Sequence, residues 1–255
     1  MRVLTLNACG IRASEKKGLF KWLRKQKSDC ICLQEVRALD NQIQGEKYSL
    51  HGYDRHMSVA DKKGYSGVAI YSKKDVLKVK NKIGSDRFDR EGRFIEVEYD
   101  NCYVSSVYFP SGSSGDERQK QKYIFMNIFE KYLKKIKSRT KPSIICGDWN
   151  IVHKEIDIKN WKSNQKNSGC LPKERAWLNK IFDDLGYIDT FRVINKKPDN
   201  YTWWSNRGKA WDNNVGWRID YQVLSPGNKV KITNAKIYKK ERFSDHSPLI
   251  INYEL

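Results

Sequence analysis

An aspartate and an asparagine stand one residue apart at the end of an apolar run near the middle of the chain. The run over residues 143–146 ends at Gly147, and Asp148 and Asn150 follow it. This pattern predicts a buried strand that brings a carboxylate and an amide to its exposed C-terminal end, on the same side. The carboxylate can take a proton from water, and the amide can donate to an oxygen that gains negative charge. A simple Asx turn at a strand end is the commoner explanation of such a pair, so the motif needs support from elsewhere.

That support comes from other apolar runs that also finish in polar side chains. Strands are predicted over residues 3–7, 29–35 and 102–108, and an Asp-His pair precedes the final strand. Taken singly, each of these side chains has a structural explanation, such as a solvated strand end or a packed aromatic ring. Together they predict one site at the edge of the fold, made of Asn7, Glu35, Tyr108, Asp148, Asn150, Asp220, Asp245 and His246.

The donors in this set are mostly oxygens. Carboxylates with open water positions suit Mg²⁺, with Mn²⁺ as an alternative, rather than zinc. The six cysteines are scattered without metal-ligand spacing. Asp220 is available to orient the imidazole of His246. An acidic metal site in a basic protein favours hydrolysis of a phosphodiester, in which Asp148 activates water while the metal and His246 polarise the phosphate.

The overall charge agrees with a polyanionic partner. The 255 residues include 49 Lys and Arg against 30 Asp and Glu, a formal net charge of +19. Such a balance favours nucleic acid first and an anionic membrane second, although a lysine-rich proteome could also produce it. The N-terminus has no apolar signal-like region, no apolar run is long enough to span a bilayer, and the cysteines suit a reducing compartment. We therefore expect a cytoplasmic protein with no membrane partner.

The pattern of elements predicts one domain over residues 1–255. Apolar and polar residues alternate over 67–72, 93–99 and 102–108, as in a strand meander. Helical periodicity is found around residues 19–23, 116–137 and 177–185, and the lysines opposite the apolar face of the long helix are interpreted as a solvated face. Strands alternating with helices, with hairpin-like stretches in both halves, indicate mixed sheets covered by helices.

A family resemblance is carried by six motifs in order along the chain. They are Leu-Asn-x-x-Gly-Ile-Arg, Leu-Gln-Glu, Tyr-Phe-Pro-Ser-Gly, Gly-Asp-Trp-Asn, Trp-Arg-Ile-Asp-Tyr and Ser-Asp-His-Ser-Pro-Leu. In these the chain resembles the exodeoxyribonuclease III family of abasic-site endonucleases, part of the endonuclease/exonuclease/phosphatase superfamily, from residue 1 to about residue 253. The resemblance implies an α/β (α+β) fold: a four-layer α/β sandwich of two facing mixed β-sheets flanked by helices.

The resemblance also implies roles within the site. Glu35 resembles the principal metal ligand, supported by Asn7, with Asp148, Asn150 and Asp245 on the same metal. Asp148 resembles the residue that positions or deprotonates water, and Asn150 the amide that orients phosphate and nucleophile. Tyr108 resembles the phenol that contacts the scissile phosphate, and His246, held by Asp220, the imidazole that polarises it. Cys9 departs from the family pattern, because many relatives carry Asp or Asn there and a thiol is a poor Mg²⁺ ligand; it argues against a second metal at that end.

The substrate-binding residues resemble those of the DNA-repair branch. Trp203, Trp217 and Ile219 match the apolar pocket that receives a flipped-out baseless sugar, and extrusion is cheapest where the base is missing. Gly169 leaves room near that pocket. The residues that match DNA-backbone contacts are Arg12, Ala13, Lys17, Gly64, Tyr65, Arg93, Asn164 and Asn167. Arg207 and Trp211 lie in a loop that could insert into DNA, or could equally be an exposed variable loop.

The function implied is a Mg²⁺-dependent enzyme that cuts DNA 5′ to an abasic site in base excision repair. The products are a 3′-hydroxyl and a 5′-deoxyribose phosphate, with 3′-phosphodiesterase, 3′-phosphatase or 3′→5′ exonuclease activity on duplexes with blocked 3′ ends. Relatives of this kind act as monomers. The alternatives are a mainly 3′-end-processing exonuclease, a non-catalytic nucleic-acid-binding regulator, which would lack some of the site residues, and a lipid or inositol phosphatase, which would lack the tryptophan pocket.

Overall fold

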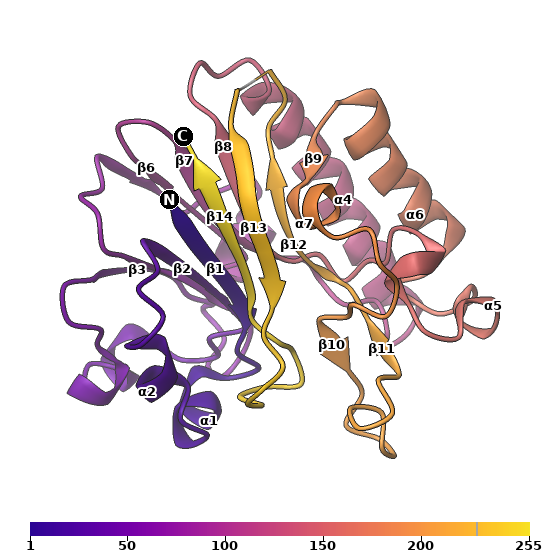
Figure 1. Cartoon of the computed structure of the whole chain (residues 1–255), viewed down its shortest axis with the longest axis horizontal. Helices are drawn as coiled ribbons and strands as arrows, with labels where there is room; N and C mark the ends of the chain where they lie inside the picture. The colour runs from indigo at the N-terminus through magenta and orange to yellow at the C-terminus, as the bar shows by residue number, and fades with distance from the viewer. Residues whose placement is uncertain (228) are drawn as a thin grey trace.

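Two six-stranded mixed sheets form the centre of the fold (Figure 1), seen in a computed structural model that describes residues 1–227 and 229–255. The first sheet has the order β13 (Lys231–Ile237), β14 (Leu249–Glu254), β1 (Arg2–Asn7), β2 (Cys30–Gln34), β4 (Val68–Ser72) and β3 (Asp54–Ser58). The second has the order β5 (Lys78–Lys80), β6 (Phe94–Glu98), β7 (Tyr103–Tyr108), β8 (Ser143–Asp148), β12 (Asp220–Leu224) and β9 (Ile188–Asp189). A separate two-stranded ribbon joins β10 (Trp203–Trp204) to β11 (Gly216–Trp217).

Alternating side chains show that the two sheets face each other. On β2, Cys30 and Cys32 lie in one apolar cluster with Ile144 and Cys146 of β8, on the opposite sheet. The intervening residues of each strand point outward, into separate clusters beneath the flanking helices. Because successive strand residues point to opposite faces, each sheet is buried on both sides, which explains the nearly unbroken apolar runs of β2 and β8.

Helices cover the outer faces of both sheets (Figure 1). On the first sheet lie α1 (Ile11–Lys16) and α2 (Leu19–Leu23), where the sequence pattern predicts one helix. The second sheet is covered by α4 (Asp116–Ile136) and by α6 (Pro172–Asn179), which continues as a π-helical turn over Lys180–Asp184. Shorter helices are α3 (Asp86–Arg90), α5 (Trp161–Asn164), α7 (Thr190–Ile194) and 3₁₀ turns over Asp40–Gln42, Glu46–Tyr48 and Glu155–Asp157. This arrangement is the expected four-layer sandwich.

The strand directions bring the polar strand ends to one edge, the lower end of the sheets in Figure 1. Strands β1 and β2 are parallel, as are β7 and β8, so all four end there. Strand β12 is antiparallel to β8 and therefore begins at that edge. Across the second sheet the register places Tyr108 beside Asp148, and Asp148 beside Asp220. Side chains far apart in the sequence thus meet in one row.

Some sequence expectations need correction. Strands β3, β5 and β13 are missing from the prediction, because their residues are partly exposed and do not form apolar runs. The interpretation of the α4 lysines as a solvated face is wrong for Lys122, which is completely buried. The cysteines are free thiols, all buried except the half-buried Cys9, as predicted. Among the described residues, none of the helices has the length and apolar character needed to cross a bilayer.

Candidate active site

Asp148 lies at the centre of the site and is almost completely buried. Its Oδ1 accepts a hydrogen bond of 2.8 Å from the backbone amide of Asn150, and its Oδ2 accepts bonds from the side-chain nitrogens of Asn7 at 2.8 Å and Asn150 at 3.3 Å. Burial, followed by the nearby charge of Asp220, raises the pKa of Asp148 above the ordinary Asp value. A buried carboxylate with a raised pKa is typical of a group that accepts a proton during a reaction.

Asn150 and Glu35 each follow a strand, and each of these two residues has a left-handed backbone. Asn150 has φ +52° and Glu35 has φ +47°, a region that non-glycine residues seldom adopt. The side-chain amide of Asn150 is fixed by donation to the carbonyl of Phe109 at 3.0 Å. Backbone strain of this kind persists only where surrounding contacts maintain it, and it concentrates at functional sites. These turns aim the two side chains at the same space as Asp148.

The Glu35 carboxylate is shared between two partners. Its Oε1 accepts 2.7 Å from Asn7 Nδ2, the same nitrogen that reaches Asp148, while Oε2 is paired with the guanidinium of Arg37. Asn7 is completely buried and receives the backbone amide of Cys9 on its Oδ1 at 2.9 Å. Burial, then the charges of Asp245 and Glu35, raises the pKa of the Cys9 thiol to about 11, so it is protonated and a weak ligand.

His246 is paired with Asp220 on the far side of Asp148. Its Nδ1 lies 2.8 Å from Asp220 Oδ2, and its Nε2 lies 3.9 Å from Asp148 Oδ2. Burial alone would lower the pKa of His246, but the charge of Asp220 and its hydrogen bond, then the charges of Asp148 and Asp245, raise it. The ring is therefore held as a cation, and it can donate to an anionic oxygen from the cavity side.

Tyr108 completes the row of strand ends. Burial, then the charge of Glu35, raises the pKa of its phenol, so the hydroxyl remains a neutral donor. The guanidinium of Arg93 lies 4.9 Å from the Tyr108 ring centre and donates to its backbone carbonyl at 3.2 Å. Arg93 also donates to the hydroxyl of Tyr65 at 2.8 Å.

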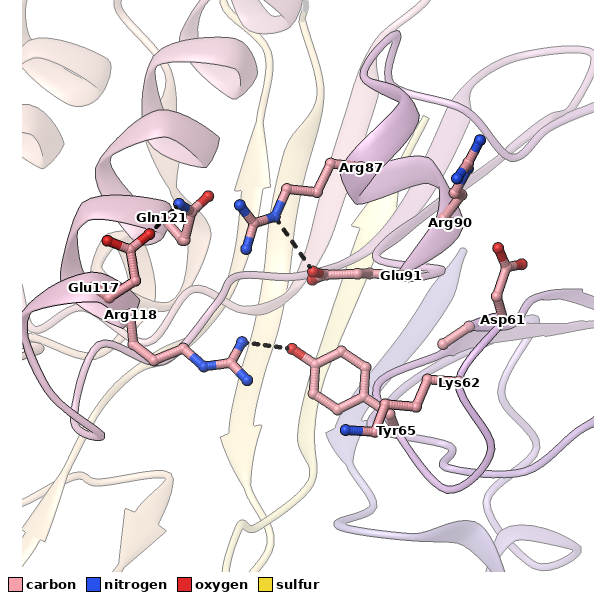
Figure 2. Close-up of a pocket in the computed structure, with 10 residues that line it drawn as sticks. Asp61, Lys62, Tyr65, Arg87, Arg90, Glu91, Glu117, Arg118 and Gln121 are labelled. Carbon is pink, nitrogen blue, oxygen red and sulfur yellow. Dashed lines mark hydrogen bonds and ion pairs between the residues drawn. The ribbon is translucent and has the colours of Figure 1, made fainter.

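A neighbouring pocket of about 530 Å³ has Tyr65 among its lining residues. Figure 2 shows that Arg118 also donates a hydrogen bond to the Tyr65 hydroxyl, at 3.1 Å. Arg90 is another lining residue of this pocket. Tyr65 is half-buried and the preceding Gly64 is exposed. Arg93 is almost completely buried and paired with Glu91, so its guanidinium contacts Tyr65 and Tyr108 and is not a free surface cation.

One large cavity joins most of the predicted site. Its volume is about 1080 Å³, and the predicted residues that line it are Glu35, Tyr108, Asp148, Asn150, Asn167, Gly169, Trp203, Arg207, Trp217, Ile219, Asp245 and His246. Asn7 and Asp220 lie behind this wall and support it. The sequence reasoning missed Arg37 and the loop Ser111–Gly115, which also line the cavity. The loop's Gly112 falls within the Tyr-Phe-Pro-Ser-Gly motif, whereas Arg37 follows no signal in the sequence.

The apolar side of the cavity is made by Trp203, Trp217 and Ile219. The two indole rings meet edge to face with centres 5.9 Å apart, and Ile219 packs in the same cluster. Trp203 Nε1 donates to Asp245 Oδ2 at 3.1 Å, which ties this wall to the acidic side chains. Gly169 lies against it, because a Cβ there would come within 3.1 Å of the Trp217 ring.

The remaining predicted DNA-contact residues lie around the cavity. Arg12, Ala13 and Lys17 are exposed on and after α1. Asn167 donates to Asn164 at 2.8 Å, so these two amides form one unit at the cavity rim. Trp211 packs on Trp204, with ring centres 4.4 Å apart, and is covered by Arg242 on another side. Its ring is therefore packed against the body of the protein, while Arg207 is exposed.

The donor set fits a hard divalent cation. Asp148, Asp220 and His246 offer ligand atoms within 4.8 Å of one another, a spacing that could hold an ion. Because His246 is already bonded to Asp220 and is cationic, we favour the Glu35 side of Asp148. There the carboxylates of Glu35, Asp148 and Asp245 offer oxygen ligands, and the Asn7 amide nitrogen supports two of them by donating to Glu35 and Asp148. Oxygen donors facing a polar cavity suit Mg²⁺ or Mn²⁺.

Comparisons with known proteins identify the family of the chain. Residues 4–246 match the model of the endonuclease/exonuclease/phosphatase family. An exodeoxyribonuclease of Bacillus subtilis is 39% identical, covering 99% of this chain and 100% of that protein. DNA repair nuclease APEX1 of Danio rerio is 35% identical, covering 98% of this chain and 81% of that protein. The solved structure of an AP endonuclease from Archaeoglobus fulgidus superposes with a TM-score of 0.89, at 25% identity and with both chains fully covered. The chain therefore belongs to the endonuclease/exonuclease/phosphatase family.

Proposed function

We propose that this chain is a Mg²⁺-dependent DNA-repair nuclease that hydrolyses the phosphodiester 5′ to an abasic site. The products are a 3′-hydroxyl and a 5′-deoxyribose phosphate. The observation that carries this proposal is the single cavity in which an acid–histidine cluster meets an apolar wall of two tryptophans. Hydrolysis of a phosphodiester needs the acid–histidine cluster, and a sugar without its base fits against the apolar wall.

In this scheme Asp148 takes the proton from the attacking water. Its raised pKa and its fixed bonds to Asn7 and Asn150 suit a positioned base. The Asn150 amide orients the water and the phosphate. Glu35, Asp148 and Asp245, supported by the Asn7 amide, would hold a divalent cation, which would polarise the phosphate and lower the pKa of water.

His246 and Tyr108 act on the phosphate oxygens. The imidazolium, kept charged by Asp220, donates from Nε2 to an oxygen that gains charge in the transition state. The Tyr108 hydroxyl donates from the neighbouring strand end, since β7 and β8 are in register there. Both donors are almost completely buried, so their hydrogen bonds to the transition state compete little with water.

Substrate selection rests on the walls of the cavity. Trp203, Trp217 and Ile219 receive the baseless sugar, and the missing Cβ at Gly169 keeps the space beside the Trp217 ring free. The residues proposed to hold the DNA backbone are Arg12, Ala13, Lys17, Gly64, Tyr65, Asn164, Asn167, Arg207 and Trp211, with Arg93 acting through Tyr65. The net charge of +19 supports a duplex DNA partner. We propose that the protein acts as a monomer in the cytoplasm.

A second candidate is a nuclease that works mainly on 3′ ends. It is favoured by the name of the Bacillus subtilis relative, an exodeoxyribonuclease. The same cluster would hydrolyse the terminal phosphodiester or a 3′ block, because its chemistry does not depend on an abasic sugar.

The test uses a 5′-labelled duplex with one stable abasic analogue, beside an intact duplex and a recessed 3′ end. We expect a Mg²⁺-dependent internal nick at the analogue that disappears with Asp148→Asn. A ladder from the 3′ ends without an internal nick would transfer the assignment to the second candidate. Binding of DNA without any cleavage would contradict both.

A further inference from the structure

A buried ion pair lies directly behind the catalytic cavity. Lys122 of α4 and Glu174 of α6 are both completely inaccessible to solvent, and the Lys122 ammonium is bonded to Glu174 Oε1. A buried pair of this kind adds little net stability, because the desolvation of both charges offsets their attraction. Such a pair can instead specify one arrangement of the groups that it holds, and here those groups, Asn150 and Gly169, line the cavity.

The lysine end of the pair holds the backbone of Asn150. Lys122 Nζ donates to the Asn150 carbonyl at 2.7 Å. Asn150 has a left-handed backbone, a conformation that its surroundings must maintain. The ammonium therefore fixes the residue whose amide is proposed to orient the water and the phosphate.

The glutamate end holds the opposite wall. Glu174 Oε2 accepts the backbone amides of Gly169 at 2.7 Å and Leu171 at 3.0 Å. Gly169 in turn packs against both Asn150 and Trp217, since an added Cβ would lie 3.0 Å from the Asn150 carbonyl and 3.1 Å from the indole. One carboxylate thus anchors the loop that carries Asn164 and Asn167 to the rim.

We propose that Lys122 and Glu174 are positioning residues for the reaction, which set the distance between the Asn150 amide and the wall formed by Gly169 and Trp217. The pair touches neither substrate nor metal and acts only through these two backbones. The rate measurement rests on the proposed function, since it uses an abasic duplex. The positioning of Asn150 by Lys122 would matter equally for any other phosphodiester that the Asn150 amide orients.

The test substitutes each partner separately. Each Glu174 oxygen accepts from two donors: Oε1 from Lys122 and Gln119, Oε2 from Gly169 and Leu171. In Glu174→Gln, the new NH₂ group must face either Lys122 and Gln119 or the amides of Gly169 and Leu171. Since two donors cannot bond to each other, the hydrogen bonds to one of these pairs are lost. Lys122→Met removes the donor to Asn150 and the cation partner of Glu174 Oε1, while the Oε2 bond that anchors Gly169 keeps both of its partners.

The matched control is Glu96→Gln. Glu96 is also a buried carboxylate with a cation partner, bonded to Arg139, Tyr132 and Ser105, but it does not line the cavity. Glu96→Gln makes the same change from carboxylate to amide as Glu174→Gln, in a similarly buried environment. Folded fractions come from circular dichroism, and all rates are expressed per folded molecule. If Lys122→Met does not fold, the Lys122→Met/Glu174→Gln double variant, which removes both buried charges, replaces it.

We expect Lys122→Met to lower the single-turnover rate on the abasic duplex by about 10²-fold with little change in the Kd for DNA, since displacing a reacting group by about 1 Å has an effect of that size. Glu174→Gln should lower the rate and also weaken binding, because the rim loop is released. Glu96→Gln should leave both unchanged. If the pair variants match the control in rate and Kd, the pair is only structural and the proposal is wrong.

A measurement independent of activity separates this proposal from the proposed function. In protein labelled with ¹⁵N-asparagine, the side-chain amide signals of Asn150 and Asn167 should move in the pair variants and stay in place in Glu96→Gln. Unmoved signals overturn the proposal. If the wild type does not cut abasic DNA, the proposed function fails, and the amide signals alone then decide whether the pair positions Asn150.

Discussion

Gly169 offers a sharp test of how closely the cavity wall is fitted. Its backbone has φ +93°, and a Cβ would come within 3.0 Å of the Asn150 carbonyl and 3.1 Å of the Trp217 ring. Both neighbours are held, Asn150 by Lys122 and Trp217 within the apolar cluster. Gly169→Ala therefore combines backbone strain with two close contacts, one of them with Asn150, whose amide is proposed to orient the water and the phosphate.

The size of each effect follows from the structure. Alanine in the left-handed region costs about 1–2 kcal/mol. The overpacking adds about 1–3 kcal/mol, because the neighbours must move by a few tenths of an ångström. Gly84 supplies the control, since it has φ +95° and a Cβ added there would meet no atom within 4 Å. Gly84→Ala should thus show the strain alone, and Gly169→Ala the strain plus the contacts.

The assay combines thermal unfolding with nicking of an abasic duplex. At about 2–4 °C per kcal/mol for a chain of this size, Gly169→Ala should lower Tm several degrees more than Gly84→Ala. It should also lower the nicking rate by about tenfold, because Asn150 is displaced by less than the 1 Å that costs about 10²-fold. Equal Tm values and equal rates for the two variants would refute the close fit between Gly169, Asn150 and Trp217.

Three further predictions concern charge and metal. Asp220→Asn removes the carboxylate that keeps His246 charged against the effect of burial, and should lower the single-turnover rate by about 10²-fold. A rate near that of the wild type would contradict the role of the Asp220–His246 pair. Burial would raise the pKa of Asp157, but the charge of Arg218 and then of Arg192 holds it below the ordinary value of about 3.9. This carboxylate thus stabilises the fold above that pH and loses its effect as pH falls through its folded pKa. Asp157→Asn should be less stable in urea at pH 7 by about 3 kcal/mol, with a gap that narrows below pH 4; a constant gap would contradict this linkage. Chelation by EDTA should abolish nicking while anisotropy still reports DNA binding, and Mg²⁺ should restore the nick; cleavage that persists in EDTA would exclude the metal role.

The positions of the main site residues could be predicted because they end apolar strands. β2 and β8 are short continuous buried runs, and the polar residues at their ends fall at one edge of the sheets. Strand β13 could not be found in this way. Its residues are half exposed along a sheet edge, so Lys231–Ile237 contains no buried run.

The support of the site could not be predicted from the sequence. Lys122 lies among other lysines of α4 and differs from them only because α6 and the Asn150 turn close over it. The bridging amide of Asn7 likewise depends on the packing of the two sheets, since Glu35 and Asp148 belong to different ones. Contacts of this type join residues distant in the chain, and no local pattern encodes them.

The most direct test of the central claim identifies both ends of the cut. A duplex with one abasic analogue is incubated with the protein and Mg²⁺, and the 5′-labelled fragment is compared with markers and offered to a DNA polymerase. We predict one fragment that ends at the nucleotide before the analogue and is extended by the polymerase, as a 3′-hydroxyl requires. A fragment that ends after the analogue, one that cannot be extended, or an uncut duplex would contradict the proposed hydrolysis 5′ to the abasic site.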